Sequence, residues 1–390
     1  MALGQEGTWG AVFPESAALG PPAWVQPGTR IVYYVASASV AQSRYQYVAE
    51  PCDPTASQYQ SPTTGQCYRR TDESGEGVGS GSGSGYAIID VVAAGGPGQV
   101  VTADSLYGID PATGALTYLP IGGGPESSGA VDSVWLHPTL LEGVLAGRAL
   151  PGGLEPLEGR YALGGTTYDI VAIQGNGDSV TFDRASGLVL VNTGAAVGAT
   201  LPVHLPGEDP SLGNRMLTYQ RLVGTRQRAA PGLGASVPGW LRPGTTLTFQ
   251  GSYTLGTAVA AQTTVAFDQV GPDWASLDAV FEVGYGGISS ANQARVVSGG
   301  AGPFWYDPDA LARMAPGDVL DVDPMVGLSV RVEDVGAWGG GQYVSIVTEG
   351  DGTLVRFIYD QATGVPLGYD LEQGVGVTSV RLTSMPAGVG

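Results

Sequence analysis

One pattern that occurs twice constrains this chain more than any other feature. Residues 24–40 read WVQPGTRIVYYVASASV, and residues 240–255 read WLRPGTTLTFQGSYTL. Each copy places a Trp, an apolar residue, a polar residue and Pro-Gly-Thr ahead of an alternating run. In the second copy Leu247, Phe249 and Tyr253 alternate with polar residues, which is the period of a strand with one buried face. We therefore predict two copies of one β-rich unit.

A second pair of segments supports the repeat and predicts one short helix in each unit. The segments VWLHPTLLEGV and FWYDPDALARM share a Trp, an apolar residue, a His or Asp, and then Pro ahead of a helical pattern. His137 and Asp307 occupy the N-cap positions, and Pro follows at the first helical position. The helices are expected at 138–145 and 308–314.

Three short motifs of the form D-x-A-[Ser/Thr]-G predict tight turns between strands. They occur at residues 110–114, 183–187 and 360–364, each between apolar runs. Asp at the first position accepts a backbone N–H, and the final Gly takes a positive φ. We interpret these motifs as hairpin turns rather than as calcium or catalytic motifs.

Together these patterns predict an all-β protein with minor α content. It would have two tandem curved antiparallel sheets, or half-barrels, each with one short helix. The closing strands of the two units are expected at MLTYQRLVGTR and VTSVRLTSM. The predicted segments are an extended N-terminal arm (1–23), unit one (24–230) with a Cys-containing, Gly/Ser-rich insertion (44–85), a linker (231–237) and unit two (238–390).

Composition excludes several classes of function. The formal net charge is −19, so a polyanion would be repelled and nucleic acid is not an expected partner. All 17 basic residues are Arg, which excludes a Schiff-base lysine, a P-loop lysine and a Ser-Lys hydrolase. The sequence has no run of 18 apolar residues, so no transmembrane segment is expected.

The two cysteines, Cys52 and Cys67, lie in a polar, turn-rich segment with no His nearby. We expect a disulfide between them, which in the chain-entropy model would contribute roughly 3 kcal/mol to stability. A disulfide would indicate an extracytoplasmic location, either periplasmic or at the cell surface or secreted, with a signal peptide removed. The alternative is a cytoplasmic chain with two reduced thiols.

No pattern in the sequence predicts a metal site or a cofactor. The chain has two histidines, His137 and His204, and neither has a second His or Cys at metal-ligand spacing. No catalytic residue is assigned. Two carboxylate pairs could nevertheless supply a general acid and a general base; these are Asp307 with Asp309 and Asp321 with Asp323. A capped helix and a polar turn explain the same residues.

The order of long strands, D-x-x-[Ser/Thr]-G turns and a short helix resembles the LolA/LppX-type periplasmic lipoprotein carriers. That resemblance implies an open half-barrel whose lining holds acyl chains. It favours a non-enzymatic, extracytoplasmic binding or carrier protein for an apolar small molecule such as a lipid. The expected ligand-binding residues are Trp135, Leu247, Phe249, Phe281 and Trp305.

Two other classes of function stay open. One is a structural or surface-assembly protein whose Gly-rich sheets self-associate through exposed edges. The other is a carboxylate-based hydrolase, for which two facing carboxylates in a cleft, one with a raised pKa, would be the indication.

Overall fold

The structure is a computed structural model. The parts of the chain that it describes are residues 9, 12–40, 46–52, 59–60, 67–71, 80–94, 98–131, 134–175, 178–197, 215–283, 288–300, 303–373, 376–387 and 389.

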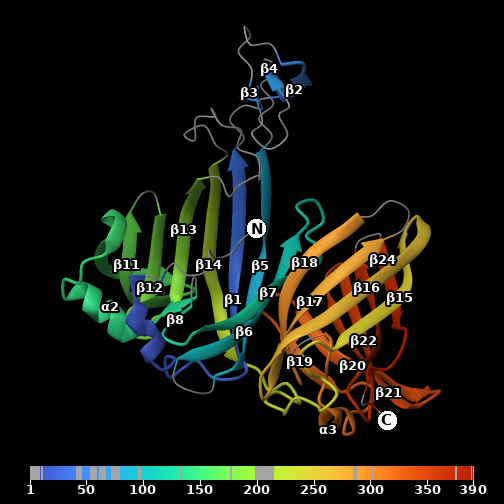
Figure 1. The fold of residues 1–390 in the computed structure, drawn as a ribbon. Helices are drawn as coiled ribbons and strands as arrows, with labels where there is room; N and C mark the ends of the chain where they lie inside the picture. Colours follow the sequence, from blue (N-terminus) through green and yellow to red (C-terminus); the bar gives the residue numbers. More distant parts are fainter. Residues whose placement is uncertain are drawn as a thin grey trace.

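The first sheet has nine antiparallel strands in the order β10-β11-β12-β13-β14-β1-β5-β6-β7. It occupies the blue-to-green half of Figure 1. Its strands are β1 (Thr29–Val40), β5 (Ser80–Ala93), β6 (Gln99–Ile109), β7 (Leu116–Ser127), β10 (Glu155–Leu163), β11 (Thr166–Gly175), β12 (Asp178–Asp183), β13 (Val189–Val197) and β14 (Arg215–Gln227).

The second sheet has ten antiparallel strands in the order β18-β17-β16-β15-β24-β23-β22-β21-β20-β19. Its strands are β15 (Thr246–Leu255), β16 (Thr257–Val270), β17 (Trp274–Val283), β18 (Ile288–Ser298), β19 (Val319–Asp323), β20 (Leu328–Trp338), β21 (Gly341–Gly350), β22 (Thr353–Asp360), β23 (Pro366–Gln373) and β24 (Gly376–Leu382).

The two sheets are similar in connectivity. In each, four strands come first, a short helix follows, and the remaining strands return so that the last one pairs with the first. The second sheet differs by one additional edge strand, β19. The helices are α2 (Pro138–Leu145) and α3 (Pro308–Leu311), with 3-10 turns η1 (Pro14–Ala18) and η2 (Pro151–Gly153). The predicted all-β class with minor α content is confirmed, and α3 is shorter than the predicted helix.

The repeated Trp-Pro-Gly-Thr segments make matching hydrogen bonds. The Trp24 indole donates to the carbonyl oxygen of Ser186 at 2.8 Å, and the Trp240 indole donates to that of Thr363 at 2.9 Å. Both acceptors lie in D-x-A-[Ser/Thr]-G turns. The Thr of each segment also donates its hydroxyl to the carbonyl of its own Trp, at 3.2 Å in both copies. Each Trp therefore joins the start of its sheet to a turn that lies more than 100 residues later in the chain.

The predicted turns and helix caps have the expected geometry. Asp110, Asp183 and Asp360 each accept backbone N–H groups within their own turns, and the final glycines have φ values of 78°, 76° and 68°. His137 accepts the N–H of Thr139 at 3.2 Å, and Asp307 accepts the N–H of Ala310 at 3.0 Å. Asp307 and His137 are therefore explained as helix caps.

One face of the first sheet packs against α2 and the N-terminal segment. Trp9 and Phe13 are buried in this core together with Trp135, which is fully enclosed. Within the predicted N-terminal arm, residues Pro14–Ala18 form the 3-10 turn η1, so the arm is not extended throughout. The corresponding core of the second sheet is built on Phe249, Trp305 and their neighbours.

Part of the predicted insertion forms a small separate sheet in the order β2-β4-β3, which lies beyond the ends of β1 and β5 in Figure 1. Another two-stranded sheet leads into α2. The bounds are β2 (Gln46–Glu50), β3 (Tyr59–Gln60), β4 (Cys67–Thr71), β8 (Ala130–Val131) and β9 (Trp135–Leu136).

The opposite face of the first sheet packs against the second sheet. Val32, Ile88 and Tyr107 of the first sheet form a cluster with Leu328 of the second sheet and with Val326 in the turn that precedes it. The edge strands β7 and β18 lie side by side, between the two sheets in Figure 1. The first sheet thus has two buried faces, which is why its strands carry apolar residues at consecutive positions such as 31–33 and 87–89.

Candidate functional site: a cavity between the two sheets

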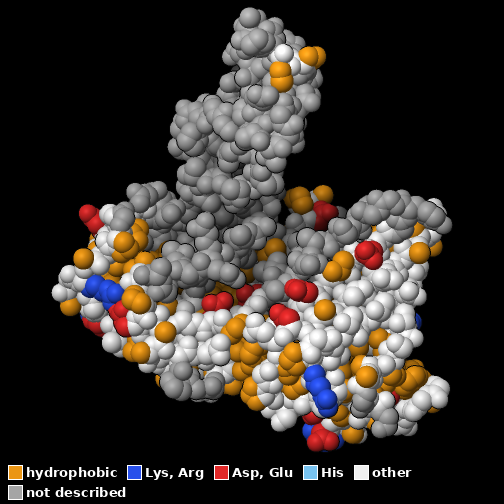
Figure 2. Space-filling view, viewed as in Figure 1, with side chains coloured by type: hydrophobic (Ala, Val, Ile, Leu, Met, Phe, Trp, Pro, Cys, Tyr) orange, Lys and Arg blue, Asp and Glu red, His pale blue; other side chains and the backbone are white. Residues whose placement is uncertain are grey.

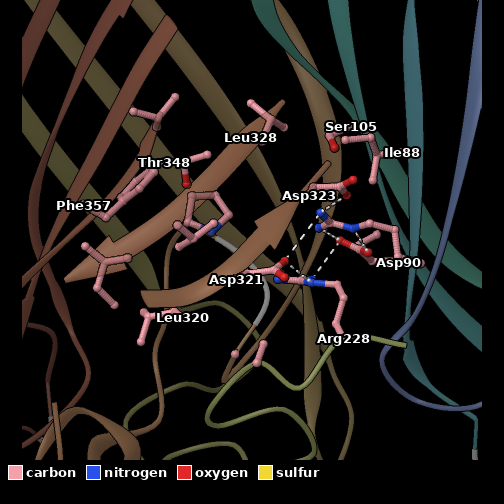
Figure 3. A pocket seen from close by; sticks show the side chains of 18 of the residues that line it. Ile88, Asp90, Ser105, Arg228, Leu320, Asp321, Asp323, Leu328, Thr348 and Phe357 are labelled. Carbon is pink, nitrogen blue, oxygen red and sulfur yellow. Dashed lines mark hydrogen bonds and ion pairs between the residues drawn. The ribbon is translucent and has the colours of Figure 1, made fainter. Parts of the chain in front are cut away.

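A cavity of about 180 Å³ lies where the outer face of the first sheet meets the hollow of the second. Strand alternation explains its lining, because residues two apart on one strand share a face. The first sheet contributes Ile88, Ala103, Ser105, Tyr107 and Tyr118. The second contributes Leu328 and Val330 from β20, Ile346 and Thr348 from β21, and Val355, Phe357 and Tyr359 from β22. Figure 3 shows Leu328, Thr348 and Phe357 on the side of the second sheet.

A buried network of ion pairs closes one side of this cavity. The guanidinium of Arg30 donates to both carboxylate oxygens of Asp90, at 2.7 Å each, and to Asp323 at 2.8 Å. Arg228 donates to Asp90 at 3.0 Å and to Asp321 at 2.9 Å. Figure 3 shows these side chains converging from both sheets. Such bidentate, charge-assisted contacts fix geometry as well as contributing energy.

The register of three neighbouring strands places these charges together. Arg30 on β1 lies opposite Asp90 on β5 and opposite Arg226 on β14. Two arginines directly opposite one another would repel. Asp321 and Asp323 reach across from β19 and contact Arg226 at 2.8 Å and 3.3 Å. The second sheet therefore supplies the carboxylates that this pair of arginines requires.

The aspartates of this network are ionised because the neighbouring arginines lower their pKa values. Burial alone would raise the pKa of Asp90, but Arg228 and Arg30 hold that pKa below its usual range. In the same way burial opposes ionisation of Asp321, while hydrogen bonding from Arg226 and the charges of Arg228 and Arg30 lower its pKa. Three arginines thus pair with three aspartates, Asp90, Asp321 and Asp323, so the formal charges of the network sum to zero.

One further acidic residue, Asp104, belongs to the lining of the cavity outside the network of ion pairs. Asp104 on β6 pairs with Ile89 on β5, so its side chain shares the inner face of the first sheet with Ile89, and Thr102 lies two residues before it on the same face. Its Oδ1 atom is buried and has no hydrogen-bond partner among the described residues. Burial raises the pKa of Asp104 to about 6. Asp104 is therefore a destabilising element of the first sheet, at a position that also belongs to the lining of the cavity.

The expected ligand-binding residues lie in the two cores. Leu247, Phe249 and Trp305 are buried in the core of the second sheet, and Phe281 packs at its margin. Trp135 is enclosed in the core of the first sheet, where its indole donates to the carbonyl of Ser128 at 3.1 Å. The structure brings the first four together but separates Trp135 from them. The cavity is lined by other residues.

The carboxylate pairs also have structural partners. Asp307 is the N-cap of α3, and Asp309 lies exposed in its first turn. Asp321 and Asp323 do lie on one face of β19, as their spacing predicts, but both carboxylates form ion pairs with arginines. A general acid is expected to have a raised pKa, whereas the pKa of Asp321 is lowered.

Some predicted residues fall outside the described parts of the chain. His204 is one of these, and so is the side chain of Cys67, so the disulfide with Cys52 stays a prediction. Within the described ranges, the side chains form no cluster of three or more potential metal ligands. No helix in those ranges combines the length and hydropathy needed to cross a membrane.

Sequence reasoning missed Arg30, Arg226 and Arg228 as site residues. Arg30 stands on a strand directly before Ile31, and an Arg beside a buried apolar run is a recognisable indication of a buried ion pair. Arg226 lies between Thr225 and Gln227 and carries no such signal. The comparisons with known proteins add no assignment: neither the protein-family models nor the curated proteins contain a match to this chain.

Proposed function

We propose that the protein is a non-enzymatic binding protein that holds an uncharged apolar molecule, or the apolar end of a lipid, in the cavity between its sheets. The observation that carries the proposal is the lining. Apolar and aromatic side chains from both sheets surround the space, and the arginines that line it are held in ion pairs with aspartates. Ligand sites in proteins are commonly apolar hollows with a few fixed polar groups.

The volume limits the ligand. A dry apolar cavity of about 150 Å³ in another protein accepts benzene. The cavity here, at about 180 Å³, would accommodate a small ring or a short stretch of acyl chain. Thr348, Ser105 and four tyrosines contribute uncharged hydroxyl-bearing side chains to the lining, and these suit a ligand with one hydroxyl or carbonyl group.

The charge network favours an uncharged ligand. An anionic head would have to compete with Asp90 and Asp323 for Arg30, and a cationic head would have to displace a buried arginine from its carboxylates. Breaking a buried ion pair in this way costs several kcal/mol, about 3–5 kcal/mol when one partner is lost. The proposal agrees with the resemblance to periplasmic lipoprotein carriers and with an extracytoplasmic location, both of which are part of it.

Native mass spectrometry of the protein purified from its source tests the proposal. A co-purified molecule of defined mass is expected, and the empty protein is expected to bind the uncharged probe Nile red. Val330→Trp, which fills the cavity from β20, should abolish both. Ser329→Trp is the matched control, because Ser329 is adjacent on β20 and faces the other side of the sheet.

The melting temperature of each variant must be measured alongside, and Thr348→Phe provides a second way to fill the cavity if Val330→Trp does not fold. A wild-type protein that carries no ligand and binds no Nile red would contradict the proposal. So would binding that both cavity-filling variants retain.

A further inference from the structure

We propose that two copies of this chain associate edge to edge through β10, in an antiparallel pair whose two-fold axis passes through Gly159. The inference concerns a surface on the far side of the first sheet from the cavity. It does not depend on the proposed ligand.

Strand β10 is the open edge of the first sheet. Its nine residues pair with β11 in one continuous register without a bulge, and among the described residues no strand pairs with its other side. Residues 155–160 are all exposed, and Leu157 is 53% exposed. The opposite edge, β7, lies against β18. Figure 1 places β11 and β12 at the end of the first sheet far from the second. An edge of this length is a template for another strand.

The hairpin turn determines which backbone groups point outward. Gly164 and Gly165 have φ values of 57° and 83°, as in a type I′ turn. The turn hydrogen bond joins Leu163 to Thr166, so the backbone groups of Leu163 point toward β11. Because hydrogen-bonded and non-hydrogen-bonded positions alternate, the outward-pointing positions are Glu158, Arg160 and Ala162, together with Pro156, which offers only its carbonyl oxygen.

Charge selects one register for a second copy. With Gly159 on the axis, Glu158 of each copy lies opposite Arg160 of the other, and Leu157 lies opposite Tyr161. Moving the second strand to either neighbouring hydrogen-bonded register places Arg160 opposite Arg160, or Glu158 opposite Glu158. Opposite charges across a strand pair stabilise it and like charges destabilise it. A two-fold contact makes each favourable pair twice.

The charged side chains are available for this pairing. Within one chain Arg160 contacts Asp169 at 3.2 Å, where both side chains are more than 70% exposed. Glu158 contacts Arg184 at 3.5 Å, and its side chain is 58% exposed. Exposed ion pairs of this kind contribute little to stability, so a second copy can take these partners at small cost. Gly159 adds no side chain at the axis.

Cysteine cross-linking at the axis tests the register directly. Non-hydrogen-bonded antiparallel residues have Cα atoms about 4.5 Å apart, which is within the range for a disulfide. A Cβ at Gly159 would meet only Ile170, at 3.8 Å, so Gly159→Cys should fold and form a covalent dimer under mild oxidation. Ala162→Cys is the matched control, since its two copies would lie about 20 Å apart along the strands.

Sedimentation provides the second measurement. The wild type is expected to dimerise, and Arg160→Glu is expected to weaken dimerisation roughly tenfold or more by converting two attractive pairs into repulsive ones. Combining Glu158→Arg with Arg160→Glu should restore it. Asp169→Asn, which removes only the partner within the chain, should leave dimerisation intact. A wild type that stays monomeric at high concentration overturns the proposal, as does a cross-link that forms equally at 159 and 162.

Discussion

The guanidinium of Arg30 on β1 donates a 2.8 Å hydrogen bond to the carboxylate of Asp323 on β19, and this contact joins the two sheets. The side chains are only 10% and 1% exposed. The same guanidinium is paired with Asp90 on its own sheet. Burial would lower the pKa of Arg30, but Asp90 and Asp323 more than compensate and raise that pKa above its ordinary value. Arg30 is therefore the centre of the contact between the two halves.

Removing this centre should destabilise the protein strongly. Arg30→Met leaves two buried carboxylates without their main partner, and the free energy of unfolding should fall by about 3–5 kcal/mol. Arg242→Met is the control, because Arg242 is exposed and lies outside both the cavity and β10, so its loss should change the free energy of unfolding by only about 0.5 kcal/mol. Urea unfolding at pH 7 measures both. Equal effects of the two substitutions would contradict the structural role of Arg30.

Acid should weaken the same contact. The pKa values of Asp90 and Asp321 are lowered in the folded protein. Their contribution to stability is present above the ordinary aspartate pKa and is lost as the pH falls through the lower folded values. Unfolding measured between pH 2 and pH 5 should therefore show stability falling in the acid range below the ordinary aspartate value, and Arg30→Met should flatten that dependence.

Asp104 should have the opposite effect. Its pKa in the folded protein is about 6, above the ordinary value, so the folded state holds the proton more tightly and stability is lost as the pH rises from about 4 to about 6. Asp104→Asn removes the ionisation and should stabilise the protein at pH 8 by up to about 3 kcal/mol, with little effect at pH 4. Thermal unfolding at both pH values measures this. A gain of equal size at pH 4 would show that ionisation is not the cause.

The repeated turns allow a comparison among three glycines. Gly114, Gly187 and Gly364 all have positive φ, so Ala at each should cost about 1–2 kcal/mol through backbone strain. A Cβ at Gly187 would also overlap the carbonyl oxygen of Leu136, and one at Gly364 that of Tyr306, whereas the space at Gly114 is open. Gly187→Ala and Gly364→Ala should therefore cost roughly 1–3 kcal/mol more than Gly114→Ala. Similar costs at all three would refute the close approach.

The predicted disulfide can be tested by alkylation of the denatured protein. Without reductant neither Cys52 nor Cys67 should be labelled, and both should be labelled after reduction. Replacing both with Ala should make the 44–85 segment more sensitive to proteolysis while the two large sheets keep their melting temperature, because the segment forms its own small sheet. Labelling without reductant would indicate free thiols and remove the argument for an oxidising compartment.

Much of the fold could be predicted from local patterns. The helix caps at His137 and Asp307, the turns that begin at Asp110, Asp183 and Asp360, and the repeated Trp segments each depend on residues a few positions apart. Their geometry follows from short-range sterics and hydrogen bonding, which depend on the identities of residues that are close together in the sequence.

The cavity could not be found in this way. The predicted lining residues Phe249 and Trp305 are apolar and belong to strand or helix patterns, but alternation shows only that they are buried, not whether they face a core or a hollow. Tyr107 and Phe357, which do line the cavity, lie 250 positions apart and carry the same alternating pattern. Which apolar face meets which depends on how two finished sheets pack, and that information is not local.

The sequence by itself determined an all-β chain with two similar sheets, and their turns and caps, because these depend on neighbours along the backbone. Only the tertiary structure decided that the first sheet is buried on both faces, that Arg30 pairs with Asp323 nearly 300 residues away, and that a largely apolar cavity lies beside them. Those outcomes depend on the balance between desolvation and pairing across an interface, which exists only when both sheets have formed.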